Sequence, residues 1–541
     1  MTFSAVRTLL LFLALLITES CNSKKTTKNT SDKPLSIFRA NLKDGAVSID
    51  PRRGRTIHAL TVSRLLFEGL TRTNTNGKAE AGIAESWTVS EDGLKYIFKL
   101  RKSVWSDGAA CTANDFVYAW RQALEPNFPS DFSSLLYCIK GAESAKKGLI
   151  STNSIGVKAK DYRTLCVTLE SPTPYFLELL TLPIYAPIPK HYASKYPKWH
   201  EKSHYIPPHN GPFTVKRWAE ADEIHLIKNS AYWEQNNVFL NEIQFIFVDE
   251  HTELAMFQNN ELDWAGSPLS VLPVDSLNHL KNNNSLAISP ALHTEFIRVN
   301  TLDPTLSNPK IRRALSLALN RQQLVDHLLQ GGQTPATGLV PLSLKKEKPS
   351  FFHDADIDEA RKLFNEALEE LSLSSDSFPS LTLTFGQDAR RRRLAQSMQE
   401  QWKEVLGIHI ELRTVESKVL FSELRQGNTQ LCMGSWVADF PDSSNFLEVF
   451  KYKDSSTNNT GWQSQAYVEL LEQANYCSTN EEREKLLNNA EALLIQDMPI
   501  IPIYFGSFVS LKKPQSAYVQ VSSIGLLDFS WKPSIKNVQI L

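Results

Sequence analysis

Residues 434–450, GSWVADFPDSSNFLEVF, begin like a buried strand and then place an acid among apolar neighbours. Residues 436–438 are apolar, and Asp439 stands between them and Phe440. A carboxylate in such surroundings is costly unless a cationic group meets it. Two partners are open at this point: an internal cation such as an arginine, or a cation that arrives with a bound molecule.

Patterns along the rest of the chain predict an α/β protein. Strand-like alternation or apolar runs occur at 95–101, 164–170, 223–229 and 241–248. Helical spacing occurs at 114–124, 311–329, 389–406 and 481–496. Thr112, followed by Asp115, predicts the cap of the first of these helices. Sheets covered by helices are therefore expected.

Length and composition indicate a protein with several lobes. A chain of 541 residues is too long for one hydrophobic core. Apolar residues make up 42% and charged residues 22%, as in ordinary globular proteins. The formal net charge of −1 gives no reason to expect nucleic acid as a partner.

The N-terminal segment is typical of an exported protein. TLLLFLALLI, at 8–17, is too short to span a bilayer but suits the core of a signal peptide. Cys21 follows, and a polar stretch at 22–34 reads as a disordered tether. This layout resembles a bacterial lipoprotein signal, so lipidation of Cys21 and an extracytoplasmic, membrane-anchored location are expected. The alternative is a cleaved signal with a soluble mature protein.

Motifs of catalysis and metal binding are missing. The sequence has no GxxxxGK[ST], GxGxxG, HExxH or GxSxG motif. Five cysteines follow Cys21 without a CxxC pair, so buried thiols are expected and one disulfide stays open. The irregular spacing of His191, His200, His204 and His209 does not favour a metal site. No cofactor and no metal are expected, and a binding protein is favoured over an enzyme.

Two charged groupings have a plain interpretation. Glu250 and Glu253 stand three residues apart, and we expect them on a solvated helix face rather than as an acid–base pair. The run of four arginines at 390–393 resembles a nucleic-acid patch, but it opens an amphipathic helix that carries acids further on. A solvated helix face is expected there too.

Several segments form an ordered set of motifs. They are residues 66–120, from LFEGLTRTNTNGK to WSDGAACTANDFVYAW, followed by HNGPFTVKRW, NSAYWEQ, SNPKIRRALSLALNRQQLVDHLLQGGQTPATGLVP and WVADFPDSSNFL. Together and in this order they resemble the motifs of one family, the oligopeptide-binding components of ABC transporters. The resemblance covers about residues 36–535.

The resemblance implies a two-lobed periplasmic binding protein fold of three domains, class II-like, which closes by a hinge motion. It implies this division: a signal peptide ending with lipidated Cys21 at 1–21, a tether at 22–34, domain I at 35–66, 204–292 and 505–541, domain II at 67–203, and domain III at 293–504.

The same resemblance implies a site around Asp439. In the family, the acid at this position receives the α-ammonium group of a bound peptide. Backbone groups of Ser435 and Val437 would hydrogen-bond to the peptide as to an added strand, which does not depend on peptide sequence. Trp436 would form a flat wall, although a core aromatic is the alternative. Other wall candidates by resemblance, each with nearby packing as its alternative, are Tyr137, Thr56 and Ser267.

The chain departs from the family at positions that bear on the ligand. A position that is Arg in one well-known member is Met433 here, which cannot bind an anion. Ser417 stands where a pocket Trp is found, and His293 and Val437 replace a disulfide. A carboxylate partner from Arg52, Arg53 or Arg55 is a further option, with solvated loop cations as the alternative. Ligand length therefore stays open.

The function implied is that of a non-enzymatic receptor. It would capture short peptides in a cleft between two lobes and deliver them to an ABC permease and its ATPase subunits in the inner membrane. It would act as a monomer without a cofactor or nucleic acid. Alternatives are another ligand on the same fold, such as a murein peptide, a nickel complex or haem, and a secreted peptide hydrolase, for which no activated nucleophile or metal pattern is found.

Overall fold

The fold is known from a computed structural model. It describes residues 37–529 except 44–47, 55, 75–76, 131, 198, 200–205, 220–221, 284, 478 and 517–518. The expected signal peptide, the lipidated Cys21 and the tether lie outside the described residues, as do Arg55, His200 and His204.

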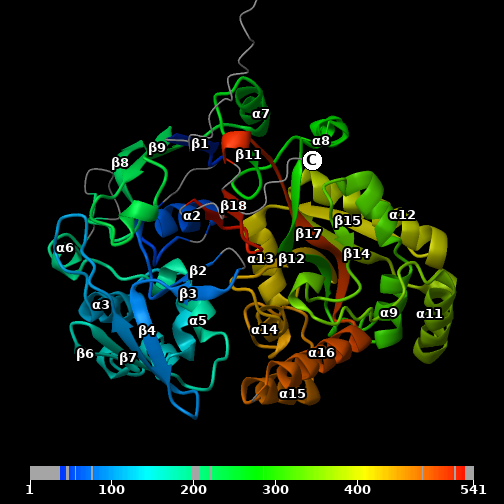
Figure 1. The fold of residues 1–541 in the computed structure, drawn as a ribbon. Helices are drawn as coiled ribbons and strands as arrows, with labels where there is room; N and C mark the ends of the chain where they lie inside the picture. The colour runs from blue at the N-terminus through cyan, green and yellow to red at the C-terminus, as the bar shows by residue number, and fades with distance from the viewer. Residues whose placement is uncertain are drawn as a thin grey trace, which may run out of the picture.

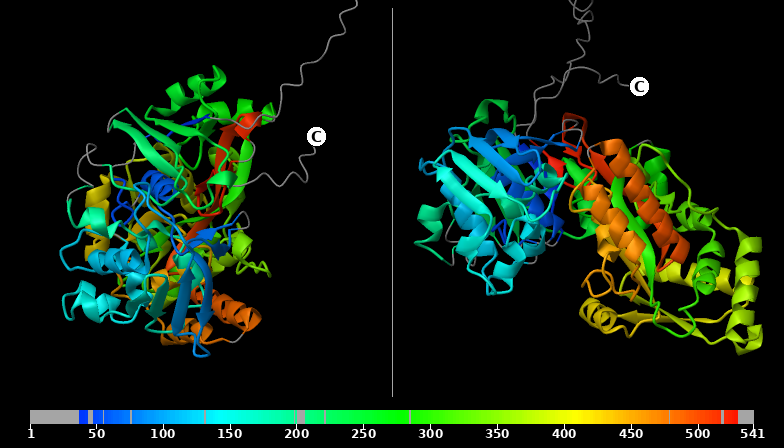
Figure 2. Two further views of the ribbon diagram at one scale, coloured as in Figure 1. Left: turned by 60° about the vertical axis from the view of Figure 1, so that its left-hand side comes forward. Right: turned by 90° about the horizontal axis from the view of Figure 1, so that it is seen from below.

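The chain forms two α/β lobes that lie side by side (Figures 1 and 2). Lobe 1 comprises the described residues of 37–283 and 514–529, and lobe 2 comprises residues 285–512. This agrees with the expected two-lobed α/β fold. The domain boundaries given above stay a prediction.

Lobe 1 contains two four-stranded sheets. The first has the order β1-β10-β9-β8, with β1 parallel to β10 and the other pairs antiparallel. The second is antiparallel, with the order β4-β5-β7-β6. The strands are β1 (Ile37–Asn41), β8 (Phe213–Ala219), β9 (Glu223–Lys228), β10 (Glu242–Ile246), β4 (Ala84–Val89), β5 (Lys95–Leu100), β6 (Val157–Asp161) and β7 (Thr164–Thr168), with the short pairs β2 (Thr71–Thr73) with β3 (Ala79–Ala81) and β18 (Gln520–Val521) with β19 (Leu527–Asp528).

Seven α-helices belong to the described part of lobe 1. They are α2 (Ile57–Leu66), α3 (Ala113–Ala123), α4 (Ala142–Lys146), α5 (Phe176–Leu179), α6 (Lys190–Ala193), α7 (Glu250–Gln258) and α8 (Val274–Asn282). Of these, α7 and α8 pack beside β11 (Trp264–Gly266) and the end of β17 (Ile500–Lys512) rather than on the two four-stranded sheets. The expected cap of α3 is confirmed, because the Thr112 backbone N–H donates to the Asp115 carboxylate at 2.7 Å.

Lobe 2 is built on one large sheet with the order β11-β17-β12-β16-β14-β15, in which β13 also pairs with β17. Its strands are β11 (Trp264–Gly266), β12 (Ala287–Val299), β13 (Thr334–Pro335), β14 (Leu381–Gly386), β15 (Ile410–Val415), β16 (Leu431–Val437) and β17 (Ile500–Lys512). Its helices are α9 (Pro309–Leu317), α10 (Arg321–Gln323), α11 (Ile357–Leu371), α12 (Ala389–Leu406), α13 (Ser417–Gln426), α14 (Ser444–Leu447), α15 (Gln465–Asn475) and α16 (Asn480–Asp497).

Two long strands join the lobes. The chain enters lobe 2 through β12 and returns through β17; each strand is 13 residues long, and residues 287–290 and 294–298 of β12 pair antiparallel with β17. β17 also pairs with β11, which belongs to the lobe 1 segment of the sequence. Register shifts interrupt the β12–β17 ladder between Pro290 and Thr294 and between Glu295 and Phe296. Such irregularities bend a strand locally, so they mark where the two-stranded connection is least regular.

The segment 311–329 is not one helix, contrary to the sequence prediction. Helix α9 ends at Leu317, and a new turn begins at Arg321, capped by Asn320, whose side-chain oxygen accepts the Gln323 N–H at 3.0 Å. The fully buried Arg321 guanidinium donates to the carbonyls of Ser316 and Pro502 and pairs with Asp354 at 3.0 Å. Apolar spacing alone could not show that this cation turns inward and interrupts the helix.

Glu253 is buried, which contradicts the expected solvated face. It lies fully buried on α7, and its carboxylate accepts hydrogen bonds from Ser270 Oγ at 2.6 Å and from the Gly266 N–H at 3.0 Å. Burial raises the pKa of this carboxyl. Glu250, three residues before it, forms an ion pair with Lys43 at 3.4 Å.

Of the loop cations before α2, Arg52 is buried and Arg53 is half-buried, where solvated residues were expected. Arg52 is 2% exposed and forms an ion pair with the fully buried Asp50 at 2.8 Å. Arg53 lies 3.6 Å from the same carboxylate, and both guanidinium groups lie over the ring of Phe128. Arg52 is therefore a structural cation of lobe 1.

Of the helices in the described ranges, none has both the length and the apolar character needed to span a bilayer.

We expect the fully buried His209 to make the protein less stable as pH falls. Burial lowers its pKa to about 3, so the folded chain keeps it neutral while the unfolded chain takes up a proton below about pH 6.5. The contribution of neutral His209 to stability is therefore complete above the pKa of the histidine in the unfolded chain, and it is lost as pH falls below that value. Between pH 7 and pH 5 the loss amounts to about 2 kcal/mol.

Urea unfolding at both pH values measures this loss. Between pH 7 and pH 5, the free energy of unfolding of His209→Phe should fall by about 2 kcal/mol less than that of the parent chain. The control His251→Gln, at an exposed position, should show the same fall as the parent. Equal pH dependence in all three proteins would contradict the assignment.

Candidate functional site

A cavity of about 390 Å³ lies between the two lobes at the end of strand β16. Lobe 2 contributes Trp436, Asp439 and Phe440, and the residues of α14 and the turn after it. Lobe 1 contributes two separate segments, one at 134–138 and one at 171–179. The complete lining is Ser134, Leu135, Cys138, Ser171, Thr173, Tyr175, Leu179, Trp436, Asp439, Phe440, Ser444, Asn445, Glu448, Val449, Lys451, Thr457 and Asn475.

Asn445 fixes the two central residues of the lobe 2 wall. Its side-chain oxygen accepts the Trp436 Nε1–H at 2.8 Å and the Asp439 backbone N–H at 3.2 Å. The indole of Trp436 is half-buried, lines the cavity and also packs against the apolar core of lobe 2, so its role as a wall for a ligand stays a prediction. Asp439 is half-buried at the same cavity.

One edge of β16 is uncovered just before Asp439. The Ala438 N–H donates to Leu292 O on β12 at 2.8 Å. Because backbone groups alternate sides along a strand, those of Ser435 and Val437 point away from β12. On that side β14 pairs with β16 only as far as Cys432, and among the described residues no strand pairs with 435–437 there. Val437 is 50% exposed.

The two lobes touch beside the cavity through a pair of aromatic rings. Tyr175 of lobe 1 stacks on Phe440 of lobe 2 with a centroid distance of 4.6 Å and an interplanar angle of 13°. Phe440 is 5% exposed and packs within the apolar core of lobe 1. Arg483 lies over the other ring of the pair, 5.8 Å from the Tyr175 centroid.

Arg483 is itself held by Asp442, so the stack has a rigid support. Both contacts between the guanidinium and the carboxylate measure 2.8 Å. Burial would raise the pKa of Asp442, but the hydrogen bonds and the charge of Arg483 outweigh it and lower the pKa. The acid therefore stays ionised in the folded chain.

Burial raises the pKa of two other titratable groups that line the cavity. Burial raises the pKa of Cys138 to about 11, so its sulfur is a protonated thiol at neutral pH. Burial also raises the pKa of Glu448, against the opposing charge of Lys451, which lies 3.7 Å away. A protonated thiol is a poor nucleophile, so Cys138 is a wall of the cavity rather than an attacking group.

A buried ion pair supports β16 from the side of the hinge strand. Glu295 on β12 is 1% exposed and accepts from Arg391 Nε at 2.7 Å, while Arg391 also lies 3.4 Å from Ser435 Oγ. Burial opposes ionisation, but the hydrogen bond from His293 and the charge of Arg391 lower the pKa of Glu295. Arg391 thus turns inward, whereas the neighbouring Arg390, Arg392 and Arg393 are exposed as the sequence predicted.

The predicted site residues fall into two groups. Ser435, Trp436, Val437 and Asp439 lie together at the cavity and the free edge. Tyr137 belongs to the same short helix as Ser134 and Cys138 but packs against the core of lobe 1 and does not line the cavity.

Thr56 and Ser267 lie elsewhere in lobe 1 and do not line the cavity either. The Thr56 side chain accepts the Ala59 N–H and caps α2. The Ser267 N–H donates to Val509 O of β17 at 2.9 Å. For both residues the observed contacts are structural.

The lobe 1 wall was missed by sequence reasoning. Residues 171–179, SPTPYFLEL, carry no pattern that predicts contact with residue 440, which is far away in the sequence. Met433, at a position where an anion-binding Arg was considered, is 1% exposed inside the core of lobe 2. The five cysteines of the described chain are free thiols, so the disulfide left open does not form in this structure.

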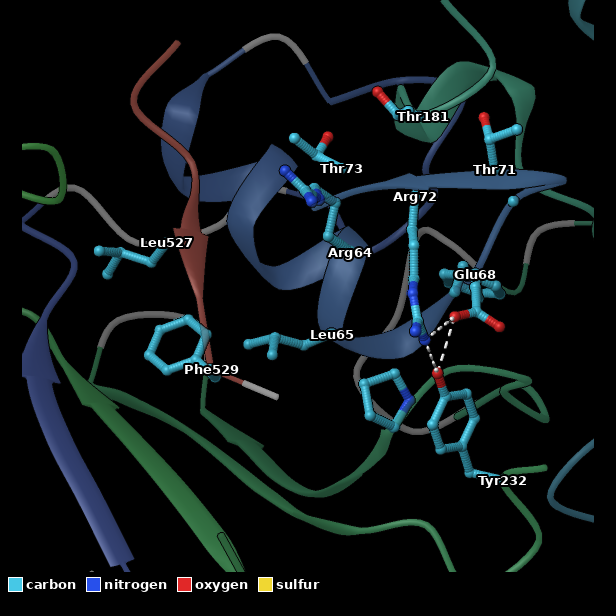
Figure 3. Close-up of a pocket in the computed structure, with 13 residues that line it drawn as sticks. Arg64, Leu65, Glu68, Thr71, Arg72, Thr73, Thr181, Tyr232, Leu527 and Phe529 are labelled. Atoms are coloured by element: carbon cyan, nitrogen blue, oxygen red, sulfur yellow. Dashed lines mark hydrogen bonds and ion pairs between the residues drawn. The ribbon is translucent and has the colours of Figure 1, made fainter. Parts of the chain in front are cut away.

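A smaller cavity of about 60 Å³ lies within lobe 1 (Figure 3). Arg72 points at Glu68 and Tyr232 there, at 3.5 Å from each, and also pairs with Glu80 and Glu234. The volume corresponds to about two water molecules. Its polar lining is internally paired, so it is a structural feature of lobe 1.

No group of three or more His, Cys, Asp or Glu side chains within the described ranges is arranged to hold a metal ion.

Two lobes joined by a pair of strands, with a cavity between them that both lobes line, define the class of solute-binding proteins. The family model described as "Bacterial extracellular solute-binding proteins, family 5 Middle" matches residues 78–458. The chain belongs to this family.

Individual relatives agree with this assignment. The chain is 37% identical over 513 residues to the oligopeptide-binding protein OppA of Bacillus subtilis, covering 93% of this chain and 94% of the relative. It is 30% identical to a probable deoxycholate-binding periplasmic protein, YgiS, of Escherichia coli, with 94% and 95% covered. The solved structure of peptide-bound Listeria monocytogenes OppA is similar with a TM-score of 0.73 and 27% identity, over 92% of this chain and 98% of that one.

We expect Tyr175→Ala to shift the ligand-free protein toward a more open arrangement of the lobes. The substitution removes one ring of the cross-lobe stack, and such pairs contribute about 0.5–1.5 kcal/mol beyond their buried area. Small-angle X-ray scattering should therefore report a larger radius of gyration. Tyr162→Ala, which removes a ring that is 66% exposed in the same lobe, is the matched control. Identical scattering from both variants and the parent would show that the stack does not hold the lobes together.

Proposed function

We propose that this protein captures short peptides between its lobes and delivers them to an ABC permease for import. The observation that carries the proposal is the free edge of β16, which leads directly to a carboxylate at a cavity between the lobes. An extended peptide can pair with both features, its backbone with the edge and its amino terminus with the acid. Oligopeptide-binding relatives and a peptide-bound structure of the same fold support this choice.

In this proposal Asp439 binds the α-ammonium group of the peptide. A carboxylate is an acceptor-only group and forms strong, charge-assisted hydrogen bonds with an ammonium donor. Two unit charges about 4 Å apart attract by about 4 kcal/mol where the effective dielectric constant is near 20, and desolvation removes part of this gain. Trp436 and the Asn445 contacts hold the acid's segment in place.

The free backbone groups of Ser435 and Val437 bind the peptide main chain. Main-chain hydrogen bonds are the same for any residue except proline, so this part of the site accepts many sequences. Side-chain selectivity then comes from the cavity, in which Tyr175, Phe440 and Glu448 differ in character. A peptide that contacts both lobes stabilises the closed arrangement, because only there are all its contacts made.

The location and partners belong to the same proposal. The protein acts outside the cytoplasm, is held at a membrane by a lipid on Cys21, and passes its ligand to the permease as a monomer. Binding rather than turnover is proposed, and incubating the purified protein with a peptide pool and searching for cleavage products by mass spectrometry would expose a hydrolase.

Asp439→Asn should weaken the binding of free-amine peptides by about 30-fold or more, since removing one partner of a desolvated charge pair costs about 2–5 kcal/mol. N-acetylated versions of the same peptides should bind weakly to the parent, and Asp439→Asn should lower their affinity only slightly further. Isothermal titration calorimetry with matched free and acetylated peptides measures both effects.

Asp454→Asn provides the control, because it removes one acid from an exposed position in the same region without touching the cavity. Equal losses for free and acetylated peptides would refute the role given to Asp439.

A further inference from the structure

The direction of the added strand follows from the position of Asp439. The acid comes two residues after the last residue of β16, Val437. A peptide with its amino group at Asp439 and its backbone beside 435–437 must therefore run antiparallel to β16, from 437 toward 435. This step rests on the proposed function.

The free edge is short because β14 occupies its continuation. β14 pairs with β16 at Leu383 with Leu431 and at Thr384 with Cys432, and it ends at Gly386. The same register places Gly386 level with Gly434. About 10 Å of edge is left at ~3.3 Å per residue, enough for two or three ligand residues. A longer peptide must leave the edge where β14 ends.

A second inter-lobe cavity, of about 840 Å³, opens at that place. Its lobe 2 wall includes Gln387 and Asp388, which directly follow β14, and Arg392 and Arg393 on the first turns of α12. Its lobe 1 wall includes Glu250 at the start of α7 and Asp275 at the start of α8. The helices α7, α8 and α12 lie toward the same side of the molecule (Figure 1).

The charges of this cavity are divided between its walls. Arg392 and Arg393 are exposed, and neither guanidinium forms an ion pair with another described residue. The acids are already engaged or lie on the opposite lobe: Asp388 accepts the Arg391 N–H at 2.7 Å as the cap of α12, and Glu250 pairs with Lys43. The lobe 2 wall, which the ligand reaches first, is therefore the cationic one.

Two nearer groups do not compete for a ligand carboxylate. Arg391 is committed to the buried Glu295, and Met433 is inside the core. Arg392 and Arg393 are the exposed cations that line this cavity.

We propose that the protein selects peptides longer than about three residues, whose C-terminal segment enters this second cavity and whose terminal carboxylate pairs with Arg392 and Arg393. The arginines of the run 390–393 then have different roles. Arg391 supports strand β16, and the next two residues meet the end of the ligand.

A length series tests the first half of this inference. The full-length protein is incubated with an equimolar pool of synthetic, mixed-sequence, free-acid peptides of two to eight residues, and native mass spectrometry reads the bound masses. Peptides of four or more residues should dominate. If dipeptides and tripeptides are retained as well as longer ones, the length selection is wrong while the proposed function stands. If no peptide of any length is retained, the proposed function fails and this inference with it.

A matched pair of variants tests the second half. Arg392→Ala with Arg393→Ala should weaken binding of a free-acid pentapeptide by about fivefold to twentyfold, as expected for two partly exposed ion pairs, and should leave its C-terminal amide unchanged. Lys403→Ala with Arg425→Ala removes two exposed cations of lobe 2 that do not line the cavity. This control should bind acid and amide like the parent.

A free-acid pentapeptide that binds the Arg392/Arg393 double variant as tightly as it binds the parent would overturn the carboxylate assignment. Equal losses in both double variants would do the same, because they would show a general effect of net charge. Both double variants should fold, because all four substituted side chains are exposed. Thermal unfolding checks this.

Discussion

The architecture depends on one uncovered length of strand. β16 is central in its sheet for most of its course, with β12 on one side and β14 on the other. The last residues of β16 extend beyond the end of β14. No described strand therefore pairs with the backbone groups of Ser435 and Val437 on that side. Unpaired strand edges are a liability in most proteins because they invite other chains to pair. Here the edge leads to Asp439 at a cavity that both lobes line, so in the proposed function the uncovered edge becomes the place where an extended peptide pairs.

The surrounding contacts keep this edge and its acid in place. On the β12 side, the Glu295–Arg391 pair fixes the start of α12 against Ser435. On the cavity side, Asn445 holds both Trp436 and the backbone of Asp439. The segment is therefore positioned by side chains from β12, α12 and α14, and its geometry does not depend on a ligand. A preformed site of this kind loses less conformational entropy on binding.

Sequence reasoning predicted local elements better than long-range contacts. The strands, α12 and the cap of α3 followed from alternation and capping residues, and the Asp439 segment was recognised through its motif. Glu253 and Arg52 were misjudged because each looks solvated in the sequence, and the partners that bury it become visible only in the fold. Tyr175 was missed for the same reason, since nothing in the local pattern shows that lobe 1 reaches Phe440.

The stack of Tyr175 on Phe440 has a kinetic consequence. A receptor that shuts without cargo is slow to admit a peptide and occupies the transporter unproductively, whereas one that never shuts releases its cargo during transit. The ring pair alone, at about 1 kcal/mol beyond its buried area, changes the ratio of shut to open molecules by about fivefold. Burial of Phe440 in the core of lobe 1 adds to this, so the contact biases an empty molecule toward the shut arrangement, and a peptide that contacts both lobes strengthens that bias.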